Sequence, residues 1–354
     1  MADDFPVIDS HIHLYPESEI STLAWATTEN PLAKQHSVCD YKAATVGMHV
    51  QGFIFLETDR KHDLEAGAKD GSGWECPLME VSWLRRIVLG QPKPGEGHDP
   101  EDASLCTAYI PWAPIPSGAA VLEKYLAKAE EAAGDSWDRV RGFRYLLQDK
   151  PDGTALGDGF IESLQLLGRK GYVFDVGVNQ HDRGRIQLEE TAEMIDKAHD
   201  GVPEEEKVVF ILNHLCKPDL TVTDVHKDTS FIAWRTAMFT LSKCSSTYMK
   251  LSGLFSEMDD WLRKLDETEI FDAIMPWLSV VLAAFGPSRI MFGSDWPVCT
   301  VGVEGAWVKW RAIMERLFYM ASLEAEDKKM ILSGTALKAY GIKKEQRSEF
   351  EFVY

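Results

Sequence analysis

Short apolar runs alternate along this chain with longer stretches in which apolar residues recur at helical spacing. Runs of this length, rich in β-branched and aromatic residues and bounded by turn residues, are typical of buried strands. The pattern predicts eight strands: Phe5–Leu14, Val50–Thr58, Cys106–Ile115, Val140–Leu147, Tyr172–Val178, Val208–Leu215, Thr247–Leu254 and Ile290–Val298.

The stretches between these runs predict helices. Ala119–Ala133 carries Leu122 and Leu126 at helical spacing, and Leu188–His199 and Ile270–Phe285 have similar patterns. Strands that alternate with helices imply parallel strands joined by crossovers. Eight such units favour a closed (β/α)₈ barrel of the α/β class over an open doubly wound sheet.

The second connection, Asp59–Ser104, is much longer than a simple crossover. Its middle, Pro77–Gly90, looks helical, and its end is rich in proline, glycine and acidic residues. Because the barrel pattern resumes directly afterwards, we interpret this connection as an insertion after the second strand. The 354 residues then form a single barrel domain over residues 1–354. We expect a last helix, Glu324–Tyr340, to complete the outer layer.

Composition and charge narrow the class of partner. The formal net charge of −19 disfavours binding to nucleic acids and anionic membranes. The six cysteines are scattered without a C-x-x-C pair, so neither a zinc ribbon nor a disulfide framework is expected. No run approaches the roughly 18 apolar residues of a membrane helix, and the first residues lack the pattern of a secretory signal. These features predict a cytosolic protein.

Parallel barrels place their active sites at the carboxyl ends of the strands, so polar residues at those ends are the candidates. The first strand ends in D-S-H-I-H, which places His11 and His13 on the same side. The two imidazoles could share a metal ion or a substrate oxygen. Taken alone, the pair equally fits two hydrogen-bonded histidines of the core.

Three further residues interrupt apolar runs. Glu57 ends the second strand, where it could bind a metal or form a salt bridge. Arg144 lies within the fourth strand and needs anionic or carbonyl partners, which could be a substrate group or an internal ion pair. His214 ends the strongly apolar sixth strand, where a lone histidine could also be a core residue.

The most specific signal is Asp295, which follows the eighth strand in the sequence GSDWP. A carboxylate there could bind a metal or take a proton from water. Together with His11, His13 and His214 it would form a site of three or four nitrogen and oxygen ligands, which suits one divalent ion, with zinc the expected one. Such an ion would lower the pKa of bound water toward about 7. A non-catalytic scaffold would leave these groups buried without compensation.

At this point the sequence resembles the amidohydrolase superfamily, specifically its amidohydrolase-2 group. The matching segments extend from residue 5 to about residue 343, and they are VIDSHIHL, GFIFLE, VRGFRYLLQ, ILNHLCKP, MKLSGLF, RIMFGSDWPV and ILSGTALKAYGI. The resemblance implies a hydrolase built on a barrel. Within the group the pattern is similar to the sugar lactonases, which implies hydrolysis of an aldonolactone, such as L-rhamnono-1,4-lactone, to the free acid.

This resemblance assigns roles to individual residues. The implied catalytic residues are Asp295, His214 and Arg144. The implied substrate contacts are Trp25, Arg144, Lys250 and Trp296. The implied metal ligands are His11, His13, Glu57, His214 and Asp295.

The sequence departs from the family pattern at two positions, and the second departure affects the expected cofactor. Thr335 stands where many relatives have asparagine, and Arg144 stands where two-metal members carry a carboxylated lysine. We therefore expect at most one ion, and metal independence stays open because some lactonases of this group work without a metal. The alternative reaction is a metal-dependent decarboxylation of an aromatic or unsaturated acid. The expected partner is a small-molecule substrate, and a homodimer is left open.

Overall fold

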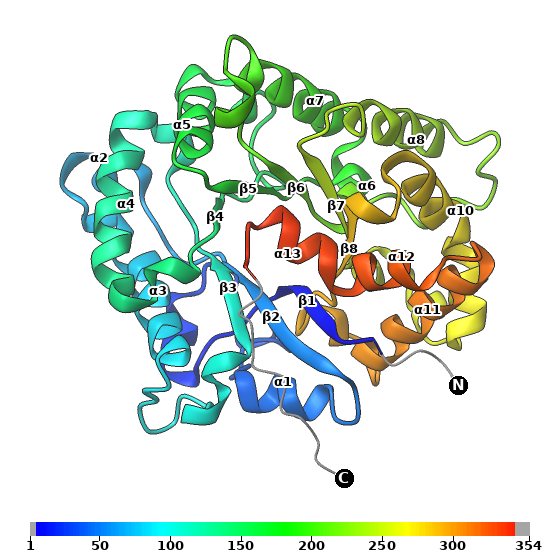
Figure 1. The fold of residues 1–354 in the computed structure, drawn as a ribbon, viewed down its shortest axis with the longest axis horizontal. Coiled ribbons are helices and arrows are strands. Elements are labelled where there is room, and N and C mark those ends of the chain that lie inside the picture. Colours follow the sequence, from blue (N-terminus) through cyan, green and yellow to red (C-terminus); the bar gives the residue numbers. More distant parts are fainter. Residues whose placement is uncertain (1–4, 344–354) are drawn as a thin grey trace.

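The computed structural model describes residues 5–343 and contains the eight predicted strands in order (Figure 1). All paired strands are parallel. Their bounds are β1 Val7–Ile12, β2 Val50–Leu56, β3 Cys106–Ile110, β4 Gly142–Arg144, β5 Val173–Val176, β6 Phe210–Leu212, β7 Thr247–Leu251 and β8 Ile290–Phe292.

Isolated β-bridges between neighbouring segments close these strands into a ring. Ladder hydrogen bonds define one sheet, β1-β2-β3, and a second sheet, β4-β5-β6-β7-β8. A parallel bridge between Trp112 and Arg144 joins β3 to β4, and another between Ile12 and Trp296 joins β1 to the segment after β8. The backbone N–H of Asp295 also donates to the carbonyl oxygen of His11 at 2.9 Å. The prediction of a (β/α)₈ barrel is confirmed.

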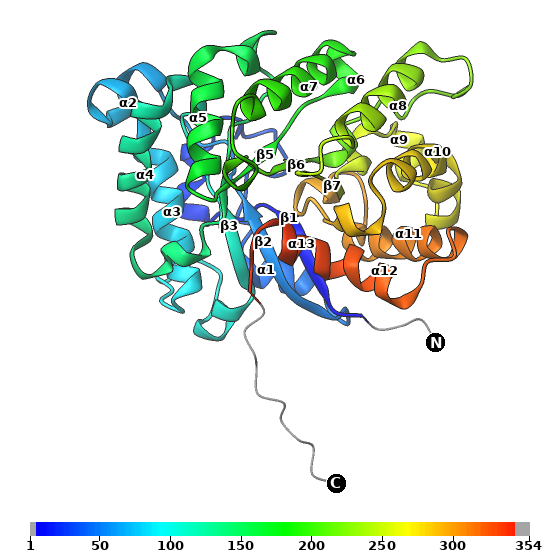
Figure 2. The same cartoon turned by 45° about the horizontal axis from the view of Figure 1, so that its top comes forward.

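A ring of helices surrounds the strands, with at least one helix after each strand (Figure 2). Their apolar faces pack on the outside of the barrel and form the larger of two hydrophobic clusters. The principal helices are α1 Val38–Ala44, α3 Glu75–Val88, α4 Ala119–Ala133, α5 Asp158–Arg169, α7 Ile186–His199, α8 Thr229–Leu241, α10 Glu267–Phe285 and α11 Ala306–Met320.

The insertion after β2 forms α2 (Leu64–Asp70) and α3, and α3 confirms the helix predicted in its middle. The insertion also supports the mouth of the barrel. Glu80 of α3 is fully buried and lies 3.1 Å from the guanidinium of Arg60, which in turn lies 2.9 Å from Glu19. This cluster connects α3 to the end of β2 and to the segment that follows β1.

The closing helix lies in a different place from the one predicted. The expectation placed it in the outer layer, but α12 (Ala325–Lys329), a π-helical turn and α13 (Thr335–Ala339) cross the N-terminal ends of β1 and β8 (Figure 1). Ala336, Ala339 and Tyr340 pack against inward-facing strand residues. Because alanine side chains are small, this helix can approach the strand ends closely and close the barrel opposite its mouth.

One sequence expectation about membrane helices needs correction. Within residues 5–343, α10 is long and apolar enough to cross a membrane by length and composition alone. It packs against α8, α11, β7 and β8 in the outer layer of the barrel.

Candidate active site

The carboxyl ends of the strands surround a pocket with a volume of about 270 Å³. Most of the predicted site residues belong to its wall. These are His13, Trp25, Glu57, Arg144, His214 and Asp295. His11 is fully buried and lies directly behind this wall, next to His13.

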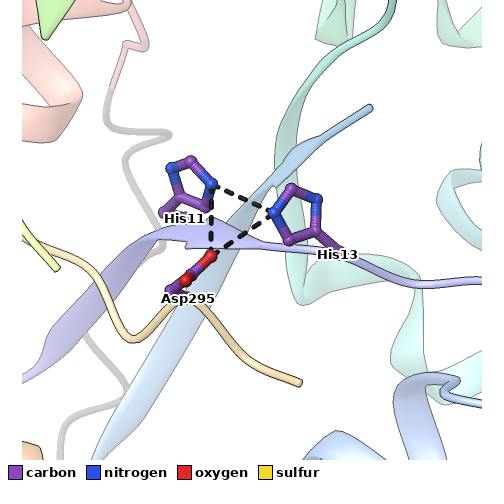
Figure 3. Close-up of side chains that lie close together, drawn as sticks. All are labelled: His11, His13 and Asp295. Atoms are coloured by element: carbon purple, nitrogen blue, oxygen red, sulfur yellow. Dashed lines mark hydrogen bonds and ion pairs between the residues drawn. The ribbon is translucent and has the colours of Figure 1, made fainter. Parts of the chain in front are cut away.

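Three of these side chains converge on one point (Figure 3). His11 Nε2 lies 3.1 Å from His13 Nε2 and 3.6 Å from Asp295 Oδ1. His13 Nε2 lies 3.4 Å from the same carboxylate oxygen. His214 approaches from β6, with its Nε2 3.8 Å from Asp295 Oδ1. The structure thus brings these four side chains close together at the mouth of the barrel.

The Nδ1 atom of each imidazole, which points away from Asp295, lies within hydrogen-bond distance of a neighbouring polar group. His13 Nδ1 lies 3.0 Å from the carbonyl oxygens of both Leu56 and Glu57. His214 Nδ1 lies 2.9 Å from Ser252 Oγ, and the Nδ1 atom of His11 lies 3.2 Å from Lys250 Nζ. Such outer partners fix the orientation of each ring, so all three Nε2 atoms are held toward the carboxylate.

Burial determines the protonation of the cluster. It lowers the pKa of His11 well below its ordinary value, and the charge of Lys250 lowers it further. It also lowers the pKa of His214 to about 3, although Asp295 acts in the opposite direction. Burial alone would raise the pKa of Asp295, but His214, a hydrogen bond with His13 and the charge of Lys217 outweigh it, so that the pKa is lowered. The cluster holds neutral His11 and His214 rings beside an ionised carboxylate at neutral pH.

The spacing of the inner atoms fits a divalent ion. Ligands about 2.0–2.1 Å from a tetrahedral zinc ion lie roughly 3.3 Å from one another, and His11, His13 and Asp295 are separated by 3.1–3.6 Å. Among the described residues these three form a group that could hold a metal, while Glu57 and His214 lie outside it. The structure therefore brings together three of the five predicted ligands.

The segment that carries His214 has an unusual backbone. The four residues 214–217 all have positive φ, with values of 54, 53, 60 and 48°. Left-handed backbone costs about 1–2 kcal/mol for each non-glycine residue, so this turn is strained and must be held by its surroundings. Trp234 Nε1 donates to the Leu215 carbonyl at 2.7 Å, and His181 N donates to that of Lys217 at 2.8 Å. The turn points His214 at Asp295 and places Lys217 in the pocket wall.

Glu57 and Arg144 form a second charged pair in the pocket, with Arg144 Nη1 3.6 Å from Glu57 Oε1. Burial raises the pKa of Glu57 to about 7, because it outweighs the opposing charge of Arg144. The Nε atom of Arg144 is buried and has no hydrogen-bond partner among the described residues. Arg144 therefore retains an unused donor.

Two predicted substrate contacts do not reach the pocket wall. Lys250 is fully buried below the mouth, where it contacts His11 and Asp175. Trp296 is also buried, and its ring packs against His36 and Tyr41. These positions give no support to a direct substrate contact by either residue.

Sequence reasoning missed two buried acids that support the site. Asp9 accepts hydrogen bonds from Ser294 N at 2.8 Å, Tyr41 Oη at 2.9 Å and Trp307 Nε1 at 2.8 Å. It thereby connects β1 to the segment that carries Asp295. Asp175 holds Lys250 at 2.6 Å. Each acid interrupts an apolar strand in the sequence, which was a usable signal.

Comparison with known proteins agrees with this geometry. The sequence model of the amidohydrolase family matches residues 8–342, which is most of the chain. This chain belongs to the amidohydrolase family. It is 35% identical over 347 residues to an L-rhamnono-gamma-lactonase from Scheffersomyces stipitis, a match that covers 96% of this chain and 99% of the relative. It is also 33% identical over 216 residues to an L-fucono-1,5-lactonase from Burkholderia multivorans, covering 60% of this chain and 67% of the relative.

The fold of this amidohydrolase also occurs in solved structures. An amidohydrolase from Burkholderia multivorans, crystallised with bound zinc, superimposes with a TM-score of 0.69 at 24% sequence identity. The match covers 95% of this chain and 99% of that structure. The two proteins therefore share the barrel over nearly their whole length.

Proposed function

We propose that this protein hydrolyses a sugar-acid lactone, such as L-rhamnono-1,4-lactone, to the free acid. The observation that carries the proposal is the ionised Asp295 in the wall of a polar pocket, surrounded by three imidazoles and accompanied by Arg144. The similarity to an L-rhamnono-gamma-lactonase over almost the full length of both proteins supports the same reaction.

The size and lining of the pocket suit a monosaccharide lactone. The pocket volume of about 270 Å³ lies just below the usual range for ligand pockets, which begins near 300 Å³, so the pocket suits a small ligand. Asn30, Gln148 and Asp149 offer polar groups to sugar hydroxyls, and the indole of Trp25 offers an apolar face to the ring. The indole is fixed because its Nε1 donates to the Thr58 carbonyl at 2.9 Å.

The residues of this pocket can carry each step of the reaction. Asp295 takes a proton from a water molecule, and the water oxygen attacks the lactone carbonyl carbon. Arg144 and Lys217, which line the pocket, stabilise the negative charge that develops on the carbonyl oxygen. The bond between the carbonyl carbon and the ring oxygen then breaks. The ring oxygen receives the proton from Asp295 and becomes a hydroxyl, and the opened chain carries the new carboxyl group at its other end.

The proposal includes one divalent ion, with zinc the expected one, held by His11, His13 and Asp295. A bound ion of this kind polarises a carbonyl oxygen and lowers the pKa of bound water. A cytosolic location and a small molecule as the partner complete the proposal, with the choice between monomer and homodimer open.

The test is a panel of aldonolactones with the purified protein, in which acid release is followed at constant pH. We expect hydrolysis of one or more sugar lactones, with L-rhamnono-1,4-lactone among the substrates. A parallel assay of CO₂ release from hydroxybenzoates examines the alternative reaction. Carbon dioxide release without hydrolysis of any sugar lactone would overturn the proposal.

A further inference from the structure

A buried carboxylate lies behind Lys217, one of the two cations in the pocket wall. Lys217 Nζ lies 3.2 Å from Glu257 Oε1. The side chain of Glu257 is 5% exposed, that of Lys217 is 18% exposed, and Glu257 lies outside the pocket wall. The ammonium is therefore held from the interior of the protein while it faces the pocket.

Three consecutive loops at the mouth of the barrel meet at Glu257. Lys217 follows β6, Glu257 ends the short turn after β7, and His181 lies on α6 (Gln180–Arg183), which follows β5. His181 Nδ1 lies 3.1 Å from Glu257 Oε2, and Ser256 Oγ lies 2.8 Å from Glu257 Oε1. Both oxygens of the carboxylate have neighbours that hold them, so its orientation is fixed.

The backbone of Lys217 is held by the same neighbour. Its φ of 48° and ψ of 70° lie in the left-handed region, and the backbone N–H of His181 donates to its carbonyl oxygen at 2.8 Å. A lysine side chain without partners occupies many rotamers, because its four-carbon stem is flexible. Here the backbone and the ammonium are both fixed, so the positive charge stands at one place in the pocket.

Stability alone gives little reason for this ion pair, because desolvation of a buried carboxylate offsets much of the attraction. Position matters more for a cation in an active site. A group that stabilises charge in a transition state is most effective when it is already in place before the reaction.

We propose that Glu257, oriented by His181, is a positioning residue that holds the Lys217 ammonium where the carbonyl oxygen of the lactone acquires its negative charge. Its effect on catalysis rests on the proposed lactone hydrolysis. Its effect on the freedom of the Lys217 amine follows from the contacts alone.

The first test is the steady-state kinetics of Glu257→Gln and Lys217→Met, with folding checked by circular dichroism. Lys217→Met should lower kcat by a factor of about 100, because it removes the charge itself. Glu257→Gln keeps the shape of the side chain but not its charge. It should lower kcat roughly tenfold with KM changed by less than about threefold, since a free lysine must be ordered in each transition state.

The double variant Lys217→Met/Glu257→Gln separates positioning from a structural role. If Glu257 acts through Lys217, its loss has no further effect once Lys217 is gone. The double variant should then keep kcat within about threefold of Lys217→Met. A further tenfold fall in the double variant would show that Glu257 acts independently of Lys217, and it would overturn the proposal.

A second readout does not depend on lactone hydrolysis. Acetic anhydride labels lysine amines, and mass spectrometry of the peptides gives the rate for each lysine. In Glu257→Gln the amine of Lys217 is no longer held against a carboxylate. Its labelling should rise at least about threefold relative to the other lysines. Unchanged labelling of Lys217 in the folded variant would overturn the proposal.

Asp102→Asn is the matched control, because Asp102 is also a buried acid paired with a more exposed lysine. It is 2% exposed and lies 2.7 Å from Lys42 Nζ, outside the pocket wall. This variant should leave kcat unchanged. If it lowered kcat as much as Glu257→Gln, loss of any such ion pair would explain the effect, and the proposal would fail.

If Glu257→Gln does not fold, Glu257→Asp decides. Aspartate keeps the charge but withdraws the carboxylate by one methylene group, and unchanged kcat and Lys217 labelling in this variant would overturn the proposal. If the wild type hydrolyses no lactone, the proposed function fails, while the labelling still decides whether Glu257 holds Lys217.

Discussion

Two carboxylates of the same pocket have opposite proton affinities, because their neighbours differ. Asp295 is buried, yet His214, His13 and Lys217 outweigh that burial and lower its pKa. Glu57 is equally buried, but Arg144 at 3.6 Å does not compensate, and its pKa rises to about 7. When the pKa values of two acids in one site differ in this way, the two acids commonly have different roles in the reaction. Asp295 suits the base, and Glu57 changes its charge near neutral pH.

Glu57 should make the stability of the protein depend on pH. Since its pKa is raised in the folded state, folding favours the protonated form, and this contribution is complete below the ordinary pKa of 4.5. It is lost as pH rises to about 7, and the loss is on the order of 3 kcal/mol. Denaturant unfolding of wild type and Glu57→Gln between pH 4.5 and pH 8 measures it. The free energy of unfolding of the wild type should fall relative to that of the variant as pH rises over this range. A difference between the two proteins that does not change with pH would contradict the raised pKa of Glu57.

For single residues, the sequence did not show how deep in the barrel each strand residue lies. His11, His13, His214 and Asp295 were predicted to gather because each stands at the end of a strand. Lys250 lies on β7, two residues before Ser252, which follows the strand. Its side chain therefore lies deeper in the barrel than the mouth and contacts His11. An apolar run shows which side chains point inward but not how far below the mouth each one lies.

At the scale of elements, the end of β7 forms the support for two histidines. The family resemblance implied a substrate contact for Lys250 in this segment. In the structure Lys250 contacts His11, Ser252 contacts His214, and Gly253 lies against the His214 ring with a φ of 67°. A Cβ atom at Gly253 would overlap that ring. The strained turn that carries His214 therefore depends on the absence of a side chain on the neighbouring strand.

Gly253→Ala should impair catalysis more than stability alone explains. The left-handed backbone costs about 1 kcal/mol for alanine, and the displaced His214 ring should lower kcat roughly tenfold or more. Thermal unfolding and lactone kinetics measure the two effects separately.

Gly305→Ala is the matched control for this prediction. Gly305 has a similar left-handed backbone, with a φ of 59° and a ψ of 30°, and a Cβ atom added there would meet no described atom within 4 Å. The Gly305→Ala variant should lose about as much stability as Gly253→Ala but keep the kcat of the wild type. Equal kcat values for the two variants would contradict the role of Gly253.

At the scale of the whole molecule, the barrel could be predicted because its signal is local and repeats eight times along the chain. The position of the closing helix could not be predicted, because an amphipathic pattern does not show whether a helix packs in the outer layer or across the end of the barrel. The interior contact of Tyr340 with Asp175 was missed for the same reason. The extent of the domain, the metal ligands and the substrate contacts remain predictions.

The charge of the whole molecule predicts how salt affects substrate capture. The net charge is −19, and acidic residues outnumber basic ones in the pocket wall. A neutral lactone should show a kcat/KM that changes less than about twofold between 0.01 M and 0.15 M salt. A lactone with an extra carboxylate is repelled, so its kcat/KM should rise at least about twofold as salt screens the charge. A decrease with salt would instead indicate that Arg144 and Lys217 dominate the local field.

The central claim is that Asp295 acts as the base in lactone hydrolysis. The direct measurement is the steady-state hydrolysis of L-rhamnono-1,4-lactone by wild type and by Asp295→Asn, with folding checked by circular dichroism. Because the amide cannot take a proton from water, kcat should fall by a factor on the order of 10² to 10⁴. A folded Asp295→Asn protein that keeps kcat within about threefold of wild type would contradict the claim.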